Sequence, residues 1–121
     1  MPDLNSLLLS SEAPKKLVDF YRRVLGREPK WIEGEYRGFE AGACTLVIGP
    51  HSEVQGQSKN PERIIMNFET REVKGEFERM KGMGAKVIAE PYSMGDDPDF
   101  LIATLADPDG NYFQLVSPMK R

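Results

Sequence analysis

The sequence predicts an α+β fold built from two copies of a strand–helix–three-strand module. Apolar residues recur at helical spacing in two segments, and short strand-like runs separated by glycine-bearing turns follow each of them. The first module is expected over residues 1–50 and the second over 63–121, with the polar segment 51–62 connecting them. The 121 residues fit the usual size of a single domain, which we expect 1–121 to form.

The first module begins with a short apolar run, residues 4–9, that we interpret as a strand. Ser10-Ser11-Glu12 supplies a candidate N-cap and an acid near the positive end of a helix, and Pro14 is tolerated in the first turn. The helix itself is indicated by apolar residues at helical spacing, ended by Gly26 as a C-cap: Leu17, Phe20, Tyr21, Val24 and Leu25. Strands are then expected near 30–33, 36–40 and 44–48.

The second module repeats this order. Residues 63–69 form the expected strand, Thr70 is a candidate cap, and Val73, Phe77 and Met80 share one face of a helix that ends at Gly82 and Gly84. Gly75 inside this helix costs about 1 kcal/mol relative to alanine. Three strands follow, at 85–90, 100–106 and 112–116, and aligning Gly26 with Gly82 superimposes the two helices in a faint internal repeat.

A tight turn precedes the last strand. Pro108 presets the backbone angle of a turn that Gly110 closes, which predicts a hairpin. Because side chains alternate along a strand, Phe113 and Leu115 point to one face and Tyr112, Gln114 and Val116 to the other. Gln114 is therefore placed where its strand offers a ligand.

Two segments together resemble the vicinal oxygen chelate superfamily, which includes glyoxalase I, the bleomycin resistance proteins and the extradiol dioxygenases. They are Asp107-Pro108-Asp109-Gly110-Asn111 with the strand after it, and the helix Leu17-Val18-Asp19-Phe20-Tyr21-Arg22-Arg23-Val24-Leu25-Gly26. The resemblance implies that both modules form a curved mixed sheet around a cavity, with the helices on the outer face. It also implies a homodimer, and a divalent metal held in the cavity by His, Glu or Gln.

The metal positions that the resemblance implies carry poor ligands in this chain. They fall on Asn5, Val47, Ile65 and Gln114. The two aliphatic side chains have no lone pair to donate, and the two amides carry no charge to offset that of the metal. A shift of one residue brings in no competent ligand except the marginal Ser6. His51, the only histidine, lies in the connection and is expected to be an ordinary surface residue. We therefore expect the fold of the family without its metal and without another cofactor.

The same register predicts which side chains line the cavity. The opposite face, toward the helices, is expected to hold Ile64, Met66, Phe68, Phe113 and Leu115. Apolar walls with a few neutral polar groups are typical of a ligand site, although a half-polar face open to water or to a partner subunit has the same composition. The expected lining is Asn5, Leu7, Leu9, Thr45, Val47, Ile65, Asn67, Glu69, Tyr112 and Gln114.

Aromatic residues near the second and third strands are candidates for a stacking wall against a planar ligand. They are Trp31, Tyr36 and Phe39, each of which also fits a packing role. The polar segment 92–99, which contains Met94, is either a loop covering the cavity or a solvated loop.

Catalysis without a metal would fall to Glu69. If it faces the cavity among apolar side chains, desolvation raises its pKa, as a general acid or base requires. No second ionisable group is paired with it in the sequence, and Cys44 and His51 form no evident nucleophile and base pair.

Composition narrows the function classes. A net charge of -3 and a pI near 5.2 argue against nucleic-acid binding, and one cysteine allows no internal disulfide. Neither a signal peptide nor a membrane segment is recognisable, so we expect a cytoplasmic protein. The leading hypothesis is a protein that binds or sequesters an aromatic or drug-like compound. The alternatives are a lyase, isomerase or dioxygenase using an atypical metal site or Glu69, and a regulatory or assembly module whose cavity is filled by side chains.

Overall fold

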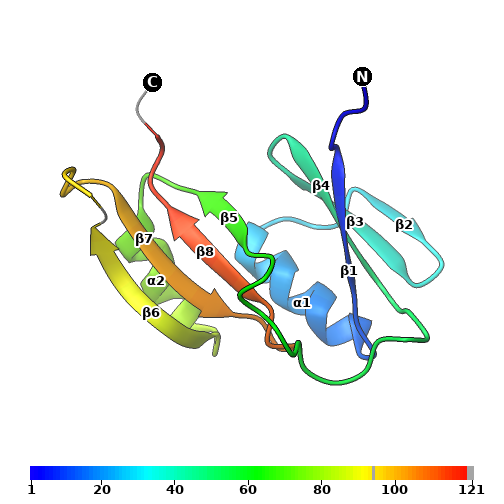
Figure 1. The fold of residues 1–121 in the computed structure, drawn as a ribbon. Helices are drawn as coiled ribbons and strands as arrows, with labels where there is room; N and C mark the ends of the chain where they lie inside the picture. The colour runs from blue at the N-terminus through cyan, green and yellow to red at the C-terminus, as the bar shows by residue number, and fades with distance from the viewer. Residues whose placement is uncertain (94, 120–121) are drawn as a thin grey trace. The chain divides into compact units, whose positions relative to one another are not determined.

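Each module forms a four-stranded mixed sheet with one helix packed against it, which confirms the α+β fold and the repeated element order (Figure 1). The computed structural model describes residues 1–93 and 95–119. The chain divides into two compact units, Met1–Gly56 and Gln57–Arg121, so the division falls inside the expected connection 51–62. Among the described residues, no helix has the length and apolarity that crossing a membrane requires.

The first unit contains one helix and four strands. They are β1 (Ser6–Ser10), α1 (Pro14–Leu25), β2 (Trp31–Glu33), β3 (Tyr36–Ala41) and β4 (Cys44–Gly49). The sheet order is β1-β4-β3-β2, with β1 parallel to β4 and the other pairs antiparallel. Phe39, Leu46 and Ile48 are fully buried on the helix side of this sheet. They pack with the buried α1 residues Leu17 and Tyr21 as the core of the unit.

The second unit repeats the arrangement with sheet order β5-β8-β7-β6 (Figure 1). Its elements are β5 (Met66–Glu69), α2 (Val73–Gly82), β6 (Lys86–Ser93), β7 (Leu101–Ala106) and β8 (Tyr112–Val116). The expected start of β5 at residue 63 is wrong, because Arg63 donates its backbone N–H to the Asn60 carbonyl in a turn. Ile64 therefore precedes the strand and is 70% exposed, so its expected position facing the helix is also wrong.

A side-chain hydroxyl precedes both helices in the same way. The N-cap of each helix lies two residues after that hydroxyl, which the sequence had suggested as the cap. Ser11 accepts a hydrogen bond from the Ala13 backbone N–H through its hydroxyl, and Thr70 accepts one from Glu72 in the same way. Ala13 and Glu72 are the N-caps, so the expected caps at 10–12 and at Thr70 are wrong in position. These hydroxyls instead stabilise the turn that leads into each helix.

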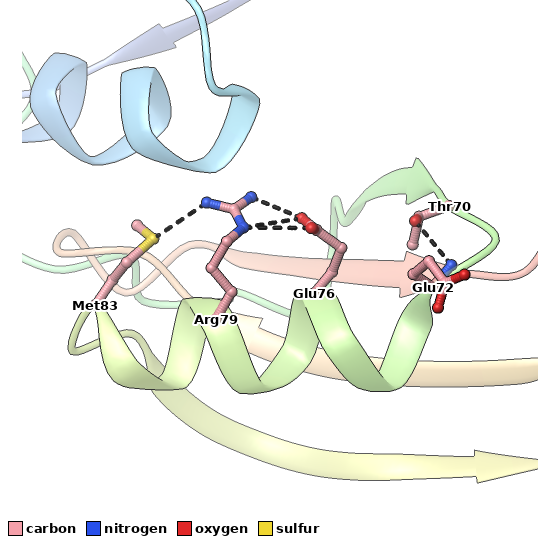
Figure 2. Close-up of polar contacts among 5 residues, drawn as sticks. All are labelled: Thr70, Glu72, Glu76, Arg79 and Met83. Atoms are coloured by element: carbon pink, nitrogen blue, oxygen red, sulfur yellow. Dashed lines mark hydrogen bonds and ion pairs between the residues drawn. The ribbon is translucent and has the colours of Figure 1, made fainter.

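Polar contacts on the exposed side of α2 run along the helix axis (Figure 2). The Arg79 guanidinium donates to the Glu76 carboxylate, with Nη2 2.6 Å from Oε2, and Nη1 lies 3.8 Å from the Met83 sulfur. An exposed pair of this kind contributes only about 0.3–0.5 kcal/mol. The stability of α2 therefore depends mainly on its buried face.

The internal repeat is clearest in the buried helix positions. Tyr21 and Phe77 occupy the same place when Gly26 is aligned with Gly82, as do two further buried pairs, Leu17 with Val73 and Val24 with Met80. An equivalent backbone hydrogen bond also precedes each helix. Ser11 donates its N–H to the carbonyl of Gly49 at the end of β4, and Thr70 donates to Val116 at the end of β8.

Two glycines are expected to respond in opposite directions to alanine. Gly26 has φ +65°, and its N–H donates to the Arg22 carbonyl, so Gly26→Ala forces an unfavourable left-handed residue and should cost about 1 kcal/mol. Gly75 lies inside α2, and a Cβ there makes an ordinary contact with Glu72. Gly75→Ala should therefore raise the free energy of unfolding by about 0.5–1 kcal/mol. Urea denaturation of both variants checks the sign. Equal effects would contradict the assignment of Gly26 as the C-cap.

Candidate functional site

The face of the first sheet opposite α1 carries a stripe of apolar side chains across its four strands. Trp31 pairs with Gly38, Gly38 with Val47, and Val47 with Leu8, so the three side chains of this row lie on one face. Leu8 is 54% exposed and Trp31 40%. The row is an accessible apolar surface, and Thr45 lies beside it, paired with Ser6.

The expected facing of the first strand is wrong by one residue. Leu7 pairs with Leu46 and Leu9 with Ile48, so both leucines lie on the helix side of the sheet. Asn5 precedes β1 and accepts the Thr45 backbone N–H through its own carbonyl. Leu8 replaces Leu7 and Leu9 on the accessible face.

Two aromatic rings lie directly over glycines on this face. A Cβ atom on Gly38 would overlap the Trp31 indole, and one on Gly49 would overlap the Tyr36 ring. The Tyr36 hydroxyl donates to the Pro50 carbonyl at 3.0 Å, which fixes the end of its ring. We call Trp31 and Tyr36 with these two glycines the aromatic platform. Phe39, the third aromatic candidate, is fully buried against α1, so its expected place in a stacking wall is wrong.

The corresponding face of the second sheet is lined by amides and hydroxyls. Asn67 pairs with Gln114, and Gln114 with Thr104, so these three polar side chains form a row. Gln114 Nε2 donates to Thr104 Oγ1 at 3.1 Å, and Tyr112 lies in the next row of the same face. This bond orients the Gln114 amide.

Several residues on these faces were not found from the sequence. Thr104 follows from alternation along 101–106, but that strand is apolar on both sides and therefore gave no clear period. Tyr92 belongs to β6, which extends to Ser93, and it pairs with Ile102 on the face that carries Gln114. The expected loop 92–99 therefore begins later, and Met94 lies outside the described residues.

Two other predicted site residues have surroundings that differ from those expected. Ile65 is half-buried but precedes β5. Glu69 is on the same face as Gln114 by register, yet it is exposed, so the desolvation expected of a general base does not occur. Neither residue has the environment that the sequence suggested.

The donor atoms on these faces do not fit a catalytic divalent metal. On β1 and β4 the accessible positions carry hydroxyl or aliphatic side chains, and on β5 and β8 the amides are joined only by the Glu69 carboxylate. Within residues 1–93 and 95–119, no three His, Cys, Asp or Glu side chains gather as a metal site would require. His51 is exposed, and its Nδ1 accepts the Glu53 backbone N–H.

A separate hollow of about 350 Å³ lies on the helix side of the first unit, where α1 meets the β2–β3 hairpin. Val18 and Ile32 supply apolar lining, while Asp19, Arg22 and Glu28 supply charge. The hydrogen bond to Asp19, with the attraction of Glu28, raises the pKa of the Arg22 guanidinium. Lys15, Glu35 and Arg37 also line the hollow, so its three cations and three acids leave no net charge for a ligand.

Comparison with known proteins shows which family the sequence resembles. Residues 6–116 match the model of the glyoxalase-like domain. The chain is 32% identical over 93 residues to YetH, an uncharacterized protein of Bacillus subtilis (strain 168). The matched segment covers 75% of this chain and 69% of YetH.

Two solved structures share the fold. A glyoxalase-related enzyme from Fulvimarina pelagi matches with a TM-score of 0.79 at 16% identity, covering 98% of this chain and 89% of its own. A glyoxalase/bleomycin resistance protein/dioxygenase family enzyme from Burkholderia phytofirmans PsJN matches with a TM-score of 0.78 at 22% identity, covering 98% of this chain and all of its own (100%).

Proposed function

The chain belongs to the glyoxalase-like domain family, and from that premise we propose that it binds or sequesters a planar aromatic or drug-like compound without using a metal. The aromatic platform is the observation that carries this proposal. Trp31 and Tyr36 both lie over glycines, so their rings rest on backbone and keep an open face for a flat molecule.

The surroundings of the two sheet faces support binding more than chemistry. Val47 and Leu8 extend the apolar surface beside Trp31. Gln114, held by Thr104, supplies an oriented amide on the second sheet. Each face, taken by itself, offers a feature common in small-molecule sites, apolar surface in the first unit and a fixed hydrogen-bonding group in the second.

The test is a pair of variants on the two faces of one strand. A panel of planar aromatic compounds is screened by thermal shift, and binders are titrated by calorimetry. Trp31→Ala should weaken binding about tenfold, since it removes the stacking surface. Ile32→Ala is the matched control, because Ile32 is exposed on the opposite face of β2 and should leave the affinity unchanged. Binding should also perturb the fluorescence of Trp31, the only tryptophan.

The proposal fails if no planar compound binds, or if Ile32→Ala weakens binding as much as Trp31→Ala. Turnover of a hemithioacetal, an epoxide or a catechol, abolished by Glu69→Gln, would instead support the enzyme hypothesis.

A further inference from the structure

We propose that the ligand of the aromatic platform is a planar organic cation, held between the two rings and the carboxylate of Glu33. This inference rests on the proposed function and specifies the charge of the compound that the site accepts.

The strand register places Glu33 beside both aromatic residues. Glu33 and Trp31 are two residues apart on β2 and therefore point to the same face. Across the hairpin, Glu33 pairs directly with Tyr36. Cross-strand partners of this kind have Cβ atoms about 5 Å apart. The carboxylate therefore lies at the border of the platform.

The negative charge of Glu33 is not compensated within the first sheet. Glu40 is the other acid on this face, and its carboxylate lies 3.5 Å from Lys30 Nζ and 3.9 Å from Arg27 Nη1. Glu33 belongs to no ion pair found among the residues that the structure describes.

The cations that reach this face, Arg27 and Lys30, precede β2 and lie at Glu40. Arg37 is the only Lys or Arg in β1 to β4, and it pairs with the buried Ile48 on the side of α1. Its guanidinium donates to the Gly34 and Tyr36 carbonyls. The open face therefore presents aromatic rings beside the Glu33 carboxylate, while its other charges are paired at Glu40.

This combination favours positive charge for two physical reasons. The faces of Trp and Tyr rings carry negative electrostatic potential, so a cation above them is attracted, and more strongly the less it is hydrated. A neighbouring carboxylate adds a Coulombic attraction that salt screens. A neutral flat molecule gains only the stacking contact, and an anion is repelled.

The experiment compares 10-methylacridinium with acridine at mildly alkaline pH, where acridine is neutral. Both have the same three fused rings. Calorimetric titration of the full chain should give about fivefold tighter binding of the cation, and added sodium chloride should reduce that preference. Glu33→Gln should lower the affinity for the cation more than the affinity for acridine, because it removes the carboxylate and leaves the aromatic rings in place.

Glu35→Gln is the matched control. It removes the same charge from the same hairpin, but Glu35 lines the hollow beside α1. It should keep the cation preference.

The outcomes separate the two proposals. Equal affinity for both probes, or a preference that Glu33→Gln leaves undiminished, overturns the cation inference, while acridine binding that depends on Trp31 still supports the proposed function. Failure of both probes to bind overturns both proposals. An equal loss in Glu33→Gln and Glu35→Gln also overturns the inference, because it would show only a dependence on net charge.

Discussion

Replacing Phe113 with alanine is expected to destabilise the protein by about 3–5 kcal/mol, because the substitution leaves a cavity at the centre of the second unit. Phe113 is fully buried on the helix side of β8. Its ring meets Phe68 edge to face, with centroids 5.9 Å apart and planes at 78°. Met66 and Leu105 are its partners on the two neighbouring strands. The ring is therefore enclosed, and its apolar neighbours on the adjacent strands cannot close the gap without moving a strand.

Urea denaturation followed by circular dichroism measures this change. A loss of this size is a large fraction of the 5–15 kcal/mol typical of a natural domain. Tyr112→Ala is the control, because Tyr112 precedes Phe113 on the same strand but is only half-buried on the other face. It should cost about 1 kcal/mol. Equal losses for the two variants would contradict the facing of β8.

Asp107→Ala is expected to cost about 2–4 kcal/mol through the turn before β8. The buried Asp107 carboxylate accepts the backbone N–H of Asp109 at 2.9 Å and that of Asn111 at 3.0 Å. It also accepts the Asn111 side-chain amide at 3.0 Å. Alanine leaves these donors without their acceptor, and hydrogen bonds to a charged group are worth about 1.5–3 kcal/mol. The backbone bonds from Gly110 to the Asp107 carbonyl and from Asp107 to the Asn111 carbonyl remain, so the variant weakens the turn without removing it.

Thermal and urea unfolding of Asp107→Ala check this expectation, with Asp109→Ala as the comparison. Asp109 belongs to the same turn, but its bond to the N–H of Ser58 is made by the backbone carbonyl, which alanine keeps. Asp109→Ala should therefore change stability by less than about 0.5 kcal/mol. If the two variants lose the same stability, the turn does not depend on the Asp107 carboxylate.

The sequence by itself determined the order of elements and the buried faces of both helices. Leu17, Tyr21 and Val24 recur at helical spacing, as do Val73, Phe77 and Met80, and all six are buried. The alternation of Tyr112 to Val116 likewise predicted which residues of β8 face α2. These features are local, because the period of one segment is enough to define its buried face. The family resemblance rests on the same local segments, and the match over residues 6–116 confirms it.

The tertiary structure alone decided the composition of the accessible sheet faces. Three consecutive leucines, Leu7 to Leu9, have no alternation, so only the parallel pairing with β4 could show that Leu8 is the exposed one. The exposure of Glu69 was equally hidden, since burial depends on neighbours distant in sequence. The placement of Trp31 over Gly38 needs the β2–β3 register, which no single segment encodes. The pattern of a strand determines which residues share a face. The strands and helices packed beside it determine which face is buried and which is accessible.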